Sequence, residues 1–92
     1  MAITLLLPPI LADVAGGRTE FALTGVGSVR AALDDLSGSY PILARRLRDE
    51  RGQLRRYVNV YVDGDDVRRL EGLDTAVREG QEILIIQSVA GG

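Results

Sequence analysis

The stretch of sequence that decides the fold is Gln81-Glu82-Ile83-Leu84-Ile85-Ile86-Gln87, close to the end of the 92-residue chain. Its centre is a continuous apolar run, so both faces of a strand formed here would be apolar. Such a run is typical of a strand that lies inside a sheet and is covered by other elements. Residues 81–87 are therefore predicted to form a central strand.

Three other segments show the alternating polarity of half-buried strands. They span residues 3–7, 19–24 and 56–62. In the last of them, one face carries Val58, Val60 and Val62, and the opposite face carries Tyr57, Asn59 and Tyr61. Asp63-Gly64 then predicts a tight turn, because glycine tolerates a positive φ. Residues 66–68 are predicted to form a short return strand.

Two helices are predicted between the second and third of these strands. Ser28 is a good N-cap, since its hydroxyl can accept a hydrogen bond from the first turn. Gly38 is predicted to end this helix. Its apolar stripe, at helical spacing, is Val29, Ala32, Leu33 and Leu36. A second, shorter helix is predicted to begin at Tyr40-Pro41, with an apolar side formed by Ile42, Leu43 and Leu47.

This order of elements places one main helix across a mixed sheet. If the first and last strands pair in the middle, they are parallel and the helix makes a right-handed crossover. That arrangement is the β-grasp, or ubiquitin-like, fold. We predict an α+β domain with four to five strands, one main helix and a second short helix, while another strand order remains open. The expected core is Ile3, Leu5, Phe21, Leu23, Val29, Leu33, Leu36, Leu47, Val58, Val60, Leu73, Ile83 and Ile85.

The composition excludes most forms of side-chain catalysis. The chain has eleven arginines but no lysine, histidine or cysteine. It therefore lacks an imidazole base, a thiolate nucleophile and a Schiff-base amine, and we expect a protein on which partner enzymes act. The formal net charge of −2 opposes nucleic-acid binding. No apolar run approaches the roughly 20 residues that span a membrane, so we expect a cytoplasmic protein.

The last two residues are the most informative for function. We expect a single domain over residues 1–92 with a flexible C-terminal tail over residues 88–92. Gly91 and Gly92 lack Cβ atoms and could pass through a channel too narrow for other residues. The group delivered would be the α-carboxylate of Gly92, with Val89 and Ala90 as the docking segment. A carboxylate becomes a good acyl donor once it is joined to AMP, and a sulfur nucleophile could then displace AMP.

Several segments together are distinctive. They are Tyr57-Val58-Asn59-Val60-Tyr61-Val62, Asp63-Gly64, Asp65-Asp66-Val67-Arg68, Gly72-Leu73-Asp74-Thr75-Ala76-Val77 and Val89-Ala90-Gly91-Gly92. With them, nearly the whole chain resembles the ThiS/MoaD group of ubiquitin-like sulfur carriers, and within it the CysO carriers of cysteine biosynthesis. The resemblance implies a β-grasp fold and a Gly92 thiocarboxylate.

The resemblance also implies partners. An ATP-dependent, ubiquitin-activating-like enzyme would adenylate Gly92 with ATP and Mg, and the carrier itself would bind no cofactor. The sulfur acceptor would be a pyridoxal-phosphate cysteine synthase or a thiosugar synthase of secondary metabolism, and the sequence does not decide between them. Two other functions stay open: a MoaD-like small subunit of a molybdopterin-synthase-type complex, and a ubiquitin-like protein-interaction module.

Two further groups of residues are candidates for a partner surface. One is Tyr57, Asn59 and Tyr61, which could equally cover the outer side of the sheet. The other is Arg45 and Arg46, which could equally form a solvated helix edge. Asp63, Asp65 and Asp66 are explained by a hairpin turn, and no metal site is predicted.

Overall fold

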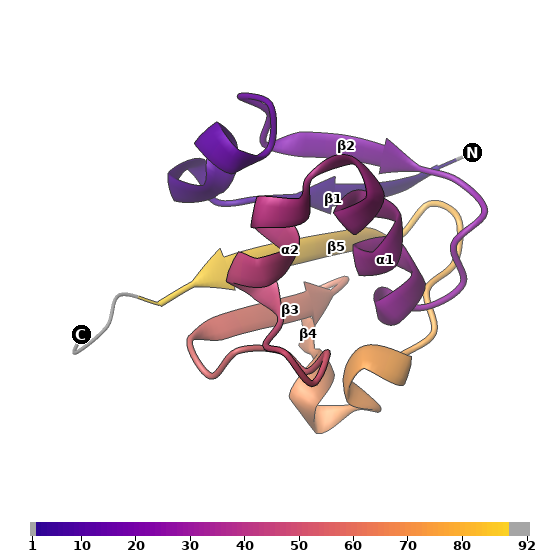
Figure 1. Cartoon of the computed structure of the whole chain (residues 1–92). Helices are drawn as coiled ribbons and strands as arrows, with labels where there is room; N and C mark the ends of the chain where they lie inside the picture. Colours follow the sequence, from indigo (N-terminus) through magenta and orange to yellow (C-terminus); the bar gives the residue numbers. More distant parts are fainter. Residues whose placement is uncertain (1, 89–92) are drawn as a thin grey trace.

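Strand β5 (Glu82–Gln87) lies at the middle of the sheet, as its apolar run predicts. The computed structural model describes residues 2–88. Its five-stranded sheet has the order β2-β1-β5-β3-β4 (Figure 1). The other strands are β1 (Ile3–Leu6), β2 (Glu20–Leu23), β3 (Val58–Val62) and β4 (Asp65–Asp66). The predicted strands are thus present, each within a few residues of its expected ends.

The register confirms the predicted β-grasp topology. Strand β1 pairs with β5 in parallel, with Leu5 beside Ile83. Strand β3 pairs with β5 in antiparallel fashion, with Val60 beside Ile85. Because β1 and β5 are parallel and far apart in sequence, the chain between them must cross over the sheet. The helices lie in that crossover.

Helices α1 (Val29–Ser39) and α2 (Pro41–Leu47) lie on one face of the sheet (Figure 1). The Ser28 hydroxyl accepts a 3.1 Å hydrogen bond from the Ala31 amide, as an N-cap should. Gly38 does not end α1, contrary to the sequence prediction, because the helix continues through Ser39. The helix ends at Tyr40, since the ring of Pro41 disfavours a helical conformation in the residue before it.

Three short 3-10 helices lie in segments for which the sequence predicts no helix. The first, η1 (Pro9–Val14), lies between β1 and β2 and buries Leu11. The second, η2 (Val67–Arg69), corrects the predicted return strand over residues 66–68. There the Asp66 carboxylate accepts a 2.9 Å hydrogen bond from the Arg68 amide, which starts a turn and ends β4 after two residues. The third is η3 (Gly72–Asp74).

The core lies between the helices and the sheet. Every residue predicted for the core is buried there. The structure adds residues from the helices, from β3 and from the irregular segments, namely Leu7, Leu11, Ala15, Ala32, Leu43, Val62, Val67 and Val77. Leu11, Ala15 and Val77 lie outside the regular helices and strands, so irregular segments also contribute to the core.

Candidate functional site

The predicted cargo site, Gly92, and the predicted docking segment, Val89, Ala90 and Gly91, lie outside the described residues. The described chain ends at Ser88, directly after β5. The Ser88 amide donates a 2.7 Å hydrogen bond to the carbonyl of Tyr57. The pairing of β5 with the β3 segment therefore continues one residue past the strand, up to the residue that precedes Val89.

The side chain of Ser88 is also held. Its hydroxyl accepts a 3.3 Å hydrogen bond from Asn59 Nδ2. The other end of the same carboxamide, Asn59 Oδ1, accepts a 2.9 Å hydrogen bond from Arg68 Nη1. The sequence makes Asn59 a candidate partner-surface residue, and the structure shows that both ends of its amide are bonded within the chain.

Part of the outer face of the sheet, opposite the helices, is apolar. Leu6, Leu84 and Tyr61 lie abreast on β1, β5 and β3. Ile86 follows on β5 and is 41% exposed. We call Leu6, Tyr61, Leu84 and Ile86 the outer-sheet patch. It begins two residues before Ser88, so an apolar surface adjoins the place where the tail leaves the sheet.

Sequence reasoning includes Tyr61 in this surface but misses its neighbours on β1 and β5. The apolar run of β5 predicts burial on both faces. In the structure the helices cover only one face, so Leu84 is half-buried and Ile86 is exposed. Strand β5 is apolar on both faces, but helices cover only one of them, and this difference is what reveals the exposed apolar surface. Exposed apolar surface beside a strand of this kind is typical of an interaction site.

The two predicted partner groups do not form one surface. Asn59 and Tyr61 alternate with the buried Val58, Val60 and Val62 and therefore face away from the helices. Tyr57, directly before β3, is 39% exposed. Arg45 and Arg46 are exposed at the end of α2, in the helical layer.

Two arginines near Arg45 and Arg46 in the sequence, Arg48 and Arg55, are bonded within the chain. Arg48 forms a 2.8 Å ion pair with Asp34 of α1, and its side chain is largely covered. Arg55 Nε donates a 2.7 Å hydrogen bond to the carbonyl of Arg45. These contacts join the end of α2 to its surroundings, so these two arginines have structural roles.

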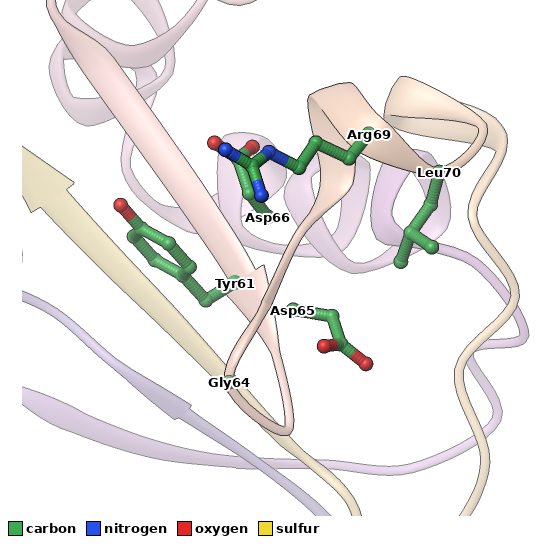
Figure 2. Close-up of a pocket in the computed structure, with 6 residues that line it drawn as sticks. All are labelled: Tyr61, Gly64, Asp65, Asp66, Arg69 and Leu70. Carbon is green, nitrogen blue, oxygen red and sulfur yellow. The ribbon is translucent and has the colours of Figure 1, made fainter.

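A hollow of about 440 Å³ lies between the β3–β4 hairpin and η2. Figure 2 shows its lining residues, Tyr61, Gly64, Asp65, Asp66, Arg69 and Leu70. Asp65, Arg69 and Leu70 are exposed, whereas Tyr61 and Asp66 are half-buried. The hollow is open and its lining carries both acidic and basic side chains. Tyr61 belongs both to this hollow and to the outer-sheet patch.

The clustered aspartates have structural roles. Asp63 Oδ1 accepts a 2.9 Å hydrogen bond from the Glu82 amide, and Oδ2 accepts one of 3.1 Å from Gln81 Nε2. Among residues 2–88, no group of three or more His, Cys, Asp or Glu side chains could hold a metal ion. In the same part of the chain, no helix has the length and apolar character needed to cross a membrane.

Comparison with known proteins places this geometry in a family. Residues 5–92 match the ThiS family. The chain is 37% identical over 94 aligned positions to the sulfur carrier protein CysO of Mycobacterium tuberculosis, with 100% of each chain covered. The crystal structure of M. tuberculosis CysO superposes with a TM-score of 0.85 at 35% identity, covering 95% of this chain and 99% of that one.

Two further relatives are informative. CysO in the BexX/CysO complex of Amycolatopsis orientalis superposes with a TM-score of 0.83 at 35% identity, covering 99% of this chain and 100% of that one. Small archaeal modifier protein 1 of Haloferax volcanii is 35% identical over 83 residues, which cover 89% of this chain and 91% of the relative. With a family match across residues 5–92 and full-length similarity to sulfur carrier proteins, the chain belongs to the ThiS family.

Proposed function

We propose that this protein carries sulfur as a thiocarboxylate on the C-terminal carboxyl group of Gly92. The observation that carries the proposal is the family match, which runs through Gly92 and is accompanied by full-length similarity to a sulfur carrier. The absence of lysine, histidine and cysteine agrees with a carrier whose reactive group is not a side chain. The bonded position of Ser88 gives the tail a fixed starting point.

The proposed chemistry has two steps. First, a Gly92 carboxylate oxygen attacks the α-phosphorus of ATP, giving a carboxyl–AMP anhydride and releasing pyrophosphate. Second, a sulfur nucleophile at the oxidation level of sulfide attacks the acyl carbon. AMP leaves with the oxygen, and a thiocarboxylate remains. Mg accompanies ATP in the partner enzyme, so the carrier needs no cofactor of its own.

The outer-sheet patch is the proposed docking surface for the activating enzyme. It is apolar, lies on the face that the helices leave open, and adjoins Ser88. An enzyme that binds this patch would hold the folded domain of the carrier while residues 89–92 reach the active site of the enzyme. From Gln87 to Gly92 an extended chain spans up to about 20 Å, which is long enough to enter an enclosed site. The complex of the related CysO with BexX is an example of a relative that binds another protein, and it does not identify which face an activating enzyme uses.

The proposed sulfur acceptors are a pyridoxal-phosphate cysteine synthase or a thiosugar synthase. Similarity to CysO favours the cysteine synthase as the acceptor. Another related CysO forms a complex with BexX, so a second acceptor is proposed beside it. Incubating the thiocarboxylate form with each purified synthase and its substrate would distinguish between the two proposed acceptors. The true acceptor should consume the thiocarboxylate at a catalytic rate, and the other should leave it unchanged.

Intact-mass spectrometry tests the central proposal. The chain is incubated with the ubiquitin-activating-like enzyme of the same organism, Mg-ATP and a sulfide source. The expected mass increase equals the replacement of one oxygen by sulfur, and a chain lacking Gly92 should show none. Full activity of a Gly91→Ala variant, or of a chain extended beyond Gly92, would instead support an interaction module or a permanent subunit.

Similarity to a small archaeal modifier protein favours protein modification as a second candidate function. The activated Gly92 carboxyl group would then acylate an amine of another protein. Because this chain has no lysine, the attached copy offers no lysine for a second copy. Each acceptor lysine should therefore gain one copy, without lysine-linked chains. Peptide mass spectrometry after activation in the presence of a cell extract would detect Gly92 joined to lysine, and a lack of such adducts would contradict this function.

A further inference from the structure

A hydrogen-bonded relay connects η2 to the start of the C-terminal tail. Arg68 Nη1 donates to Asn59 Oδ1 at 2.9 Å, and Asn59 Nδ2 donates to Ser88 Oγ at 3.3 Å. The second guanidinium nitrogen, Arg68 Nη2, donates to the carbonyl of Arg55 at 2.9 Å. The relay therefore joins three segments that are distant in sequence: the loop before β3, the turn after β4 and the end of β5.

The donors and acceptors of Arg68 and Asn59 determine how the Asn59 amide is oriented. A guanidinium only donates hydrogen bonds, so the group of Asn59 that faces Arg68 must be its carbonyl oxygen. The amide nitrogen of Asn59 then faces the other way, toward Ser88. The planar guanidinium reaches two acceptors at once in a set geometry, which a lysine ammonium does not reproduce. Arg68 thus determines which end of Asn59 is presented to the tail.

Arg68 is itself held in place. Its amide donates a 2.9 Å hydrogen bond to the Asp66 carboxylate, which caps η2. The preceding residue, Val67, is fully buried and anchors the turn in the core. A long exposed side chain ordinarily samples many rotamers, but here its backbone is fixed at the base and its head group at two acceptors.

At the other end of the relay, Ser88 is held by two hydrogen bonds. Its amide donates to the carbonyl of Tyr57 at 2.7 Å, and its hydroxyl accepts from Asn59. Ser88 directly precedes Val89 in the chain, so these two bonds fix the residue from which the tail departs. A residue that is already fixed in the free protein loses less conformational entropy on binding, so the binding free energy is more favourable.

We propose that Arg68 is a positioning residue which, through Asn59, sets the direction in which the tail leaves the sheet and so assists delivery of Gly92 to the activating enzyme. This inference rests on the proposed function of Gly92. In this role Arg68 takes no part in the reaction of the carboxylate with ATP. It affects how readily the carrier binds the activating enzyme. Its loss should raise the KM for the carrier roughly five- to tenfold and change kcat by less than about twofold.

The test compares Arg68→Lys, Ser88→Ala and the double variant in a pyrophosphate-release assay with the activating enzyme and Mg-ATP. Ser88 lies after the last strand residue, so Ser88→Ala should not disturb the core. Arg69→Lys makes the same chemical change one residue away, outside the relay, and serves as the matched control. Each single variant should raise KM by a similar factor, and the double variant should be no worse than the worse single one, since both act through Asn59.

Amide hydrogen exchange gives a second readout without any partner. The Ser88 amide should exchange faster in Arg68→Lys than in the parent or in Arg69→Lys, while exchange of the β5 amides is unchanged. Effects of Arg68→Lys and Ser88→Ala that multiply in the double variant, or an unchanged Ser88 exchange rate, would overturn the relay. Failure of the parent chain to be adenylated would overturn the proposed function, and the delivery role with it.

Discussion

The amide of Ser88 lies 2.7 Å from the carbonyl oxygen of Tyr57, one residue beyond the end of β5. This bond extends the pairing of the central strand with the β3 segment up to the residue before Val89. In the proposed function, residues 89–92 enter the active site of another protein. A Ser88 held against the sheet, next to an exposed apolar surface, suits that task because the residue before Val89 keeps a defined position on the folded domain.

Replacing Gly91 by valine should impair activation without affecting the fold. If the tail passes through a channel shaped for glycine, the added side chain costs about 1–3 kcal/mol through steric overlap. Activation should fall by the corresponding factor, measured as ATP-dependent thiocarboxylate formation. Gly91→Ala, which adds only one methyl group at the same position, should lose less activity than Gly91→Val and serves as the matched control for side-chain size. Equal activity of Gly91→Val and the parent chain would contradict the narrow-channel interpretation.

Replacing Ile86 by glutamate should weaken binding of the activating enzyme. Ile86 is 41% exposed on the outer-sheet patch, so a carboxylate there remains solvated in the free carrier and becomes desolvated in the complex. The loss of binding free energy should exceed about 1 kcal/mol, as for a central interface residue. Titration calorimetry against the enzyme checks this.

The matched control is Ile42→Glu. Ile42 is 52% exposed but lies on α2, in the helical layer on the opposite side of the sheet. Its replacement should leave the affinity unchanged. If Ile42→Glu weakens binding and Ile86→Glu does not, the enzyme docks on the helical face instead.

Replacing Leu11 by alanine should destabilise the domain strongly. Leu11 is 0% exposed, although it lies in a segment with no regular pattern in the sequence. Truncating a buried leucine lowers the free energy of unfolding by about 2–5 kcal/mol, because a cavity replaces its contacts. Its neighbour Ile10 is 62% exposed, and Ile10→Ala should change stability by less than about 0.5 kcal/mol. Urea unfolding followed by circular dichroism measures both, and similar values would contradict the burial of η1.

Replacing Asp63 should uncouple the β3–β4 turn from the start of β5. Asp63 has a φ of 48°, and its carboxylate accepts two hydrogen bonds from Gln81 and Glu82. Asp63→Ala loses both bonds and tolerates the left-handed backbone poorly, so a loss of about 1–3 kcal/mol is expected. Asp63→Asn keeps the backbone tolerance and one acceptor oxygen, so this variant should retain more stability. Thermal unfolding ranks the two variants, and the reverse order would refute this role of the carboxylate.

Local patterns predict where the strands lie, but they leave another strand order open, and the structure decides it by placing β1 beside β5. The apolar run of β5 predicts its central place, and the alternation around Val58 and Val60 predicts β3 and its buried face. Period and turn chemistry are local properties, so a sequence displays them directly. The predicted return strand over residues 66–68 is present as β4 but ends at Asp66, because the Asp66 side chain accepts the hydrogen bond of the Arg68 amide and starts a turn.

The sequence by itself determined where most strands and helices lie, the absence of lysine, histidine and cysteine, and the Gly91-Gly92 pair on which the proposed function depends. Only the tertiary structure decided which apolar residues stay exposed, because burial of Leu84 and Ile86 depends on how much of the sheet the helices cover. It also decided that Arg68, Asn59 and Ser88 meet. Their contact requires three distant segments to lie side by side, and no local pattern encodes such a meeting.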